Sequence, residues 1–152
     1  MKNVLICLAL TLISFPAMAQ HQSSAEAEIR TAVKAFNDAY AGNDVDAYFS
    51  HYAADAMVYF YGDRQDLSAY REEWAEMVEA GGAVEKNELS DLQVQVMPGG
   101  DVAVASYFVD YRLRAPDGTV SVAKAFESEV WLETSEGWKI VALHYSEIPG
   151  DQ

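Results

Sequence analysis

The sequence predicts a single α+β domain in which helices cover one face of a strongly bent, mostly antiparallel sheet. In the first half of the chain, apolar residues recur every three or four positions, which is typical of amphipathic helices. In the second half the period changes to two, and long segments are separated by turn sequences rich in glycine and proline. Helices followed by a meander of strands favour the α+β class.

The first nineteen residues have the features of a signal peptide. Lys2 gives a positive start, residues 4–15 form an apolar run, and Ala17-Met18-Ala19 supplies the small residues that precede a cleavage site. The run is shorter than the roughly 20 apolar residues of a membrane span. We therefore predict cleavage after Ala19, which leaves residues 20–152 as one secreted or periplasmic domain.

Composition narrows the possible partners. The net charge of −14 becomes −15 once Lys2 is removed, and the only cysteine, Cys7, leaves with the leader. Such an acidic surface repels nucleic acid and anionic lipid, so neither a nucleic acid nor a membrane is expected as a partner. No metal-ligand spacing, phosphate-binding loop or nucleophile elbow is present in the sequence, so we expect no metal and no cofactor.

The helical half is predicted to contain three helices and one short strand. Ser23 and Glu26 stand three apart, as a capping box requires, and place the start of the first helix. The predicted elements are a helix over 24–41, a shorter helix capped by Asp44, a strand over 57–61, and a helix from Asp66 to the Gly81-Gly82 pair.

The second half is predicted to form four consecutive antiparallel strands. Each segment alternates or runs apolar, and the breaks between segments contain Pro-Gly-Gly, Pro-Asp-Gly and Glu-Gly sequences. The predicted strands cover residues 89–97, 102–114, 120–133 and 138–145.

Several of these segments together resemble a known superfamily. Residues 39–48 followed by 53–58 resemble the helix-turn-helix-to-strand opening of the nuclear transport factor 2-like superfamily, and residues 137–146 are similar to its last strand. Residues 99–103, the hairpin at 115–118 and the segment Glu127–Trp131 are similar to the calcium/calmodulin-dependent kinase II association domain and to the SnoaL-like proteins related to it.

The resemblance implies a cone-shaped α+β barrel with a cavity between sheet and helices, and a homodimer through the outer face of the sheet. It also implies that the residues nearest to the cavity are Tyr107, Val109, Glu127, Glu129, Trp131 and His144. A glutamate beside His144 could act as general base and acid. The alternative is that both acids are solvated on the outer face and that His144 is a hydrogen-bonded core residue.

Two departures from the relatives are informative. The ketosteroid isomerases of the superfamily carry a carboxylate base near the position of Phe60, so that chemistry is not expected. Arginines that line the association-domain pocket would align near Val109 and Glu129, so anion binding is not expected at those two positions. The remaining candidate cations, Arg71, Arg112 and Arg114, are ordinary surface positions on the simpler interpretation.

The excess of tyrosine over phenylalanine favours a cavity whose walls offer polar atoms. The aromatic residues predicted to contact a ligand are Tyr40, Tyr59, Tyr70, Trp74, Tyr107, Tyr111 and Trp131. Our first hypothesis is a secreted binding protein for a small molecule or a peptide terminus. The alternatives are a SnoaL-like lyase or isomerase that uses His144 with Glu127 or Glu129, and an oligomerisation hub.

Overall fold

The computed structural model describes residues 15–149. Most of the predicted signal peptide, residues 1–14, lies outside the described residues, so cleavage and export stay predictions. Within the described chain, no helix is both long enough and apolar enough to cross a membrane.

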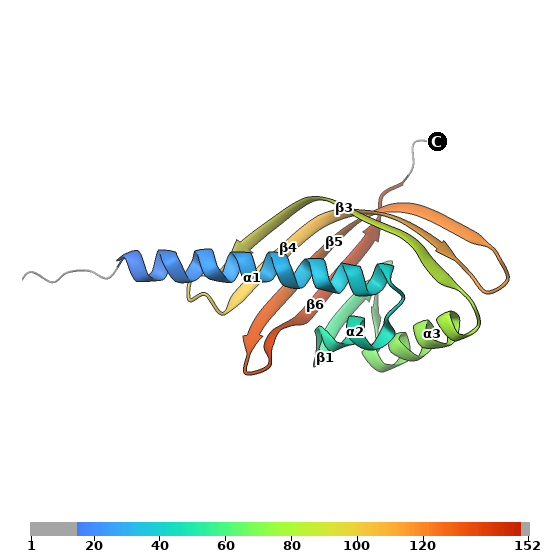
Figure 1. Ribbon diagram of the computed structural model, residues 1–152, viewed down its shortest axis with the longest axis horizontal. Helices are drawn as coiled ribbons and strands as arrows, with labels where there is room; N and C mark the ends of the chain where they lie inside the picture. Colours follow the sequence, from blue (N-terminus) through green and yellow to red (C-terminus); the bar gives the residue numbers. More distant parts are fainter. Residues whose placement is uncertain (1–14, 150–152) are drawn as a thin grey trace, which may run out of the picture.

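Three helices pack on one curved sheet of six strands (Figure 1). The sheet order is β2-β1-β6-β5-β4-β3, in which β1 runs parallel to β6 and all other neighbours are antiparallel. The sheet is open rather than closed, and α1 lies along its concave face. The predicted α+β cone is confirmed. The elements are α1 Phe15–Ala41, α2 Val45–Ser50, β1 Tyr52–Phe60, β2 Asp63–Gln65, α3 Leu67–Glu79, β3 Ala83–Val96, β4 Val102–Arg114, β5 Val120–Thr134 and β6 Gly137–Glu147.

Some predicted boundaries were wrong. Helix α1 does not begin at the Ser23–Glu26 capping box but already at Phe15, because Pro16 falls in the first turn, where proline is tolerated. Strand β2 was missed, and β3 begins six residues before the predicted Leu89. The two other helix starts were predicted well, since Asp44 accepts a hydrogen bond from the Ala47 amide and Asp66 from the two amides at 68 and 69.

Bulges bend the sheet around the helices. The register of β3 against β4 shifts twice, and at the second shift Asp91 adopts a left-handed φ of 55°. The register of β6 against β5 shifts where Val130 faces Ala142 but Trp131 faces Ile140, which leaves Val141 as an extra residue. An extra residue in one strand bends that strand and reverses the facing of every residue beyond it.

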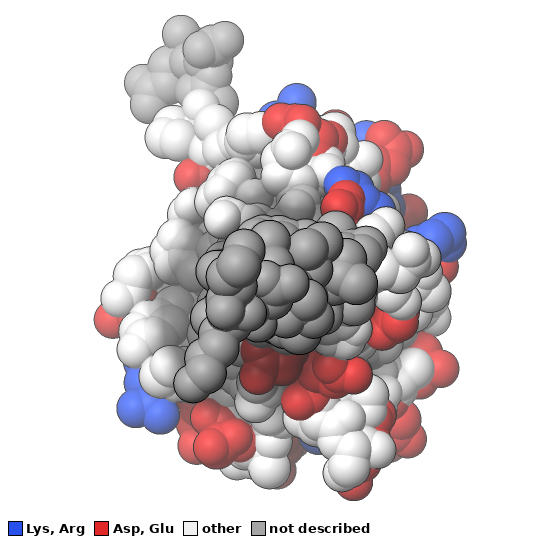
Figure 2. Space-filling model, turned by 90° about the vertical axis from the view of Figure 1, so that its left-hand side faces the viewer, with Lys and Arg blue, Asp and Glu red and all other residues white. Residues whose placement is uncertain are grey.

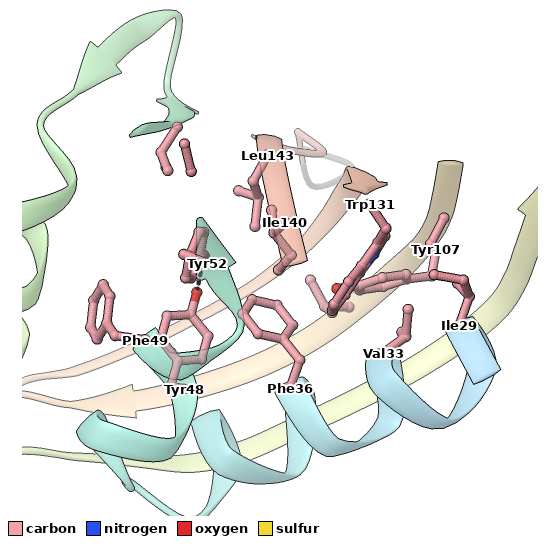
Figure 3. Packing of buried hydrophobic residues seen from close by; sticks show 14 of the residues in the cluster. Ile29, Val33, Phe36, Tyr48, Phe49, Tyr52, Tyr107, Trp131, Ile140 and Leu143 are labelled. Carbon is pink, nitrogen blue, oxygen red and sulfur yellow. Dashed lines mark hydrogen bonds between the residues drawn. The ribbon is translucent and has the colours of Figure 1, made fainter. Parts of the chain in front are cut away.

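The core lies between α1 and the concave face of the sheet (Figure 3). Ile29, Val33 and Phe36 from successive turns of α1 meet Trp131 and Ile140 from the sheet, and all five are at most 1% exposed. Burying each such side chain stabilises the fold by about 1.5–3 kcal/mol. This packing fixes α1 across the sheet and so fixes one wall of the space beyond Phe36.

Acidic residues outnumber basic ones in the chain, and the face in Figure 2 shows more acidic than basic side chains. Arg112 and Arg114 both contact Glu85, at 2.7 and 2.8 Å, and Arg71 contacts Asp46 at 2.5 Å. All three arginines are therefore paired at the surface. The outer face of the sheet also exposes apolar side chains, among them Met57, Tyr59 and Val122.

Candidate functional site

A cavity of about 470 Å³ opens between the concave face of the sheet and the three helices. Its volume falls within the roughly 300–1,000 Å³ that small-molecule sites occupy. Aromatic side chains from α1, α2, α3, β1, β4, β6 and the β1–β2 turn make up half of its lining residues. These are Phe36, Tyr40, Tyr48, Phe60, Tyr61, Tyr70, Tyr111 and Tyr145.

The aromatic rings form a continuous arc around the cavity. Each ring centroid lies 5.0–6.2 Å from the next in the series Tyr40, Tyr48, Tyr70, Phe60, Tyr145 and Tyr111. Such tilted and edge-to-face contacts hold the rings in fixed orientations. The wall is thus built before any ligand arrives.

Buried tyrosine hydroxyls bond to one another at one side of the cavity. The Tyr48 hydroxyl lies 2.9 Å from that of Tyr52 and 3.2 Å from that of Tyr70 (Figure 3 shows the first pair). Burial raises the pKa of all three phenols above their usual range. They therefore remain neutral hydroxyls near neutral pH, able to donate and accept hydrogen bonds.

A pair of carboxyl groups lies behind the aromatic wall. Tyr107 Oη lies 2.5 Å from Glu127 Oε1 and 2.5 Å from Glu129 Oε1, and Trp131 Nε1 donates to Glu129 Oε2 over 2.7 Å. Glu129 has no exposed surface, whereas Glu127 is half-buried and reaches the cavity. No ion pair of the described residues involves either glutamate.

The hydrogen bonds around Tyr107 require one of the two carboxyls to carry a proton. A phenol donates one hydrogen bond, and Tyr107 Oη already accepts one from Asn37 Nδ2 at 3.0 Å. One of its two contacts with carboxyl oxygens must therefore be donated by the acid. Glu129 is fully buried and the charge of Glu127 raises its pKa further, so the consistent arrangement is that Glu129 donates to Tyr107 and Tyr107 donates to the Glu127 carboxylate.

Burial explains why this pair holds a proton. Desolvation is the largest influence on both acids, and it raises the pKa of Glu127 to about 7 against the partial opposition of its hydrogen bond from Tyr107. The pKa of Glu129 is raised well above its usual range by burial and then by the nearby charge of Glu127. Glu127 can therefore gain or lose a proton near neutral pH while facing the cavity.

Two asparagines extend this network, and the sequence reasoning missed both. Asn37 donates to the Val33 carbonyl and to Tyr107, and Asn87 Nδ2 donates to Asn37 Oδ1 over 2.9 Å. Asn37 is only 6% exposed. Asn37 lies one turn after Val33 on the buried face of α1. A polar residue on an otherwise apolar helix face could have predicted a buried hydrogen-bond network at this position.

A second polar cluster lies at the rim. Tyr61 and Tyr111 donate to Glu147 Oε1 over 3.1 and 2.8 Å, and Tyr145 lies 3.5 Å from the same oxygen. Tyr61 sits in the β1–β2 turn with a left-handed φ of 55°. Of these residues, only Tyr111 was predicted to contact a ligand.

His144 does not face the cavity, and its predicted pairing with a glutamate is wrong. Strict alternation from Ile140 would point His144 inward, but the extra residue Val141 reverses the facing of the rest of β6. Leu143 and Tyr145 then face inward beside Glu129 and Glu127. His144 lies opposite Ser128 on the outer face and is exposed.

The other predicted residues fall into three groups. Tyr40, Tyr70, Tyr111 and Glu127 line the cavity, whereas Tyr107, Glu129 and Trp131 lie behind its wall in the network described above. Trp74 is buried 4.7 Å from the Tyr48 ring and does not line the cavity. Tyr59 lies beside His144 on the outer face, because successive strand residues alternate in direction, so its predicted place in the cavity is wrong.

The fold and the site together define a protein of the nuclear transport factor 2-like class, a curved sheet with a pocket beneath its helices. A family model of the SnoaL-like domain matches residues 29–151. The chain belongs to this SnoaL-like family, as its sequence resemblance implied. A search of the curated proteins found no match.

Solved structures confirm the fold. An NTF2-like protein from Rhodospirillum rubrum, described as of unknown function in nutrient uptake, is 21% identical with a TM-score of 0.70, covering 80% of this chain and 98% of its own. A proposed dehydratase of the NTF2-like family from Streptomyces avermitilis is 18% identical, with a TM-score of 0.69 and coverages of 84% and 99%. A proposed calcium/calmodulin-dependent kinase II association domain from Xanthomonas campestris is 18% identical, with a TM-score of 0.65 and coverages of 82% and 88%. At these identities the likeness is one of fold alone.

Proposed function

We propose that the protein binds a small, partly apolar organic molecule in the cavity of its concave face. The observation that carries the proposal is the preformed tyrosine wall, whose rings offer apolar contact while their hydroxyls and Glu127 offer a few oriented polar atoms. Sites of this composition bind drug-sized ligands in many folds. Phe60 lines the cavity. The family resemblance puts the isomerase carboxylate near this position, and the phenylalanine there favours binding over that reaction.

A blocked cavity tests this proposal. Ser121 lines the cavity and lies opposite Leu113, whereas the next residue, Val122, lies opposite Arg112 on the outer face. We expect Ser121→Trp to abolish the thermal shift given by any ligand found in a small-molecule library, and Val122→Trp to preserve it. Native mass spectrometry of protein from its host supplies the ligand search. A bound molecule that Ser121→Trp does not displace would place binding elsewhere.

Proton transfer is a second candidate function, favoured by the position and the pKa of Glu127. A carboxylate with a pKa of about 7 can take a proton from a weakly acidic carbon of a bound molecule and return it to another atom, with no oxidant or second reactant needed. Protein in deuterated water should then exchange carbon-bound hydrogen of enolisable carbonyl compounds, as followed by NMR. Glu127→Gln should abolish the exchange and Glu73→Gln, also at the cavity, should preserve it.

Export and dimer formation are also proposed. The leader pattern of residues 1–19 supports export, and N-terminal sequencing of host-expressed protein should find Gln20 first. The exposed Met57, Tyr59 and Val122 support a homodimer through the outer face. Light scattering should then give twice the chain mass, and Val122→Glu should halve it.

A further inference from the structure

The charge inside the cavity has one sign. Of the described residues that line the cavity, only Glu73 and Glu127 carry a charge, and none is a lysine or an arginine. Arg71, Arg112 and Arg114 are held at the surface by Asp46 and Glu85. An anionic ligand would therefore meet repulsion and no compensating cation.

The walls of the cavity contain aromatic rings that are tilted or edge-on to one another. The arc that runs from Tyr40 through Tyr70 and Tyr145 to Tyr111 surrounds the space on the side of the helices and on that of the sheet. The face of an aromatic ring attracts a cation within about 6 Å of its centroid, and several rings together form the cages that bind ammonium groups. The lining is thus attractive to positive charge even without its carboxylates.

The Glu127 carboxylate would supply the negative charge that pairs with a cationic ligand. Its carboxyl receives a hydrogen bond from Tyr107 but pairs with no basic residue of the described chain, although it is largely withdrawn from water. A withdrawn carboxylate without a cation is electrostatically unsatisfied. A positively charged ligand would relieve this state, whereas a neutral ligand would leave it unchanged.

From the aromatic arc and the unpaired Glu127 we infer that the ligand of this cavity is an organic cation, an amine or quaternary ammonium group on a small apolar or hydroxylated body. The inference rests on the proposed binding function and adds the ligand class to it. The cationic group lies against Glu127 and the tyrosine rings, and the body of the ligand extends toward the rim. The protein's net charge of −14 favours the approach of such a ligand over long distances.

The inference also predicts that ligand affinity depends on pH. A cation favours the ionised form of Glu127, whose pKa of about 7 means that binding must displace a proton at lower pH. Affinity should therefore fall as the pH drops below about 7. The titratable groups around Glu127 are Glu129, Glu73 and the phenols of Tyr107, Tyr145, Tyr40, Tyr48, Tyr52 and Tyr70. Burial raises the pKa of each of these phenols, so the tyrosines stay neutral in this range. Burial and the charge of Glu127 raise the pKa of Glu129 and so favour its protonated form.

A pair of nearly isosteric probes tests the charge directly. Choline and 3,3-dimethylbutan-1-ol have the same shape, but only choline is charged. By ligand-observed NMR on the full chain at about pH 7.5, we expect choline to bind about tenfold more tightly, and the preference to shrink to at most about twofold in Glu127→Gln. Glu88→Gln, which removes one exposed carboxylate outside the cavity, is the matched control and should retain the preference.

The outcomes separate the inference from the proposed function. Equal or tighter binding of the neutral alcohol, or a choline affinity that does not weaken from about pH 8 to 6, would overturn the inference while leaving the binding function intact, provided Ser121→Trp abolishes the alcohol signal. A library and host-protein search that finds no molecule displaced by Ser121→Trp would overturn the binding function itself. If Glu127→Gln does not fold, the pH series on the unaltered protein still decides.

Discussion

The pKa of carboxyl groups is shifted in opposite directions on the two faces of the sheet. On the outer side, Glu85 is bound by Arg112 and Arg114, and their hydrogen bonds and charges hold its pKa below the usual range. On the concave side, Glu127 and Glu129 have no basic partner, and burial raises the pKa of both. The outer acid therefore contributes to a surface ion pair, whereas the inner acids form a site that can bind charge or move a proton.

The largest expected effect comes from removing the support of the inner pair. Trp131→Ala should lower the free energy of unfolding by about 3–5 kcal/mol, because it leaves a large cavity and removes the hydrogen bond to Glu129. Its neighbour Leu132, 36% exposed on the other face, gives the control, and Leu132→Ala should cost less than about 1.5 kcal/mol. Equal costs in urea unfolding would contradict the difference between the faces.

The next effect is a loss of stability with rising pH. The folded protein keeps a proton on Glu127 up to a pKa of about 7, whereas the unfolded chain releases it near 4.5, so this contribution is complete below about 4.5 and is lost as the pH rises to 7. The loss from Glu127 alone is about 3 kcal/mol at most. Glu129, whose pKa burial also raises, adds a loss of the same sign. Burial lowers the pKa of His51, so the contribution of His51 to stability rises with pH up to about 6.5. This rise offsets part of the loss due to Glu127. Urea unfolding from about pH 5 to 8 measures the sum.

Glu129→Gln isolates the inner pair from every other group. The amide can donate to Tyr107 and accept from Trp131, so both hydrogen bonds are kept without an ionisable acid. We expect the variant to match the unaltered protein near pH 5 and to exceed it in stability by about 1–3 kcal/mol near pH 8. A pH dependence identical to that of the unaltered protein would show that the pair is not the source.

A smaller effect is expected at the outer acid. Glu85→Gln should reduce stability slightly at low ionic strength and not at all in about 1 M salt, because exposed ion pairs are weak and screened. Its stabilising contribution is present above the usual pKa of a glutamate and disappears as the pH falls through the lowered value. If the stability of Glu85→Gln depends on pH near 7 differently from that of the unaltered protein, the inner carboxyl pair is not the only source of that pH dependence.

The smallest effect is expected at His144. Because it is exposed on the outer face, His144→Ala should change neither ligand affinity nor the free energy of unfolding beyond measurement error. A tenfold loss of binding would mean that β6 faces differently from the arrangement found here.

Two neighbouring regions show why part of the site could be predicted. Strand β4 pairs with β5 without any shift, so strict alternation holds along it and keeps Tyr107, Val109 and Tyr111 together on the concave face. Strand β6 contains one extra residue, and the same rule failed there for His144. Alternation is a local property, whereas the position of a bulge depends on how two strands match over their whole length.

By itself the sequence determined the α+β class, the family, most helix and strand positions and the tyrosine-rich character of the cavity, because periodicity, capping residues and turn residues act over a few positions. Only the tertiary structure decided that the carboxyl groups of Glu127 and Glu129 share the Tyr107 hydroxyl. The hydrogen-bonded network joins side chains of two strands, Tyr107 from β4 and Glu127, Glu129 and Trp131 from β5, with Asn37 from α1. These hydrogen bonds form only when α1 packs on the concave face of the sheet. The raised pKa of Glu127 follows from that burial, and burial is a property of the whole fold.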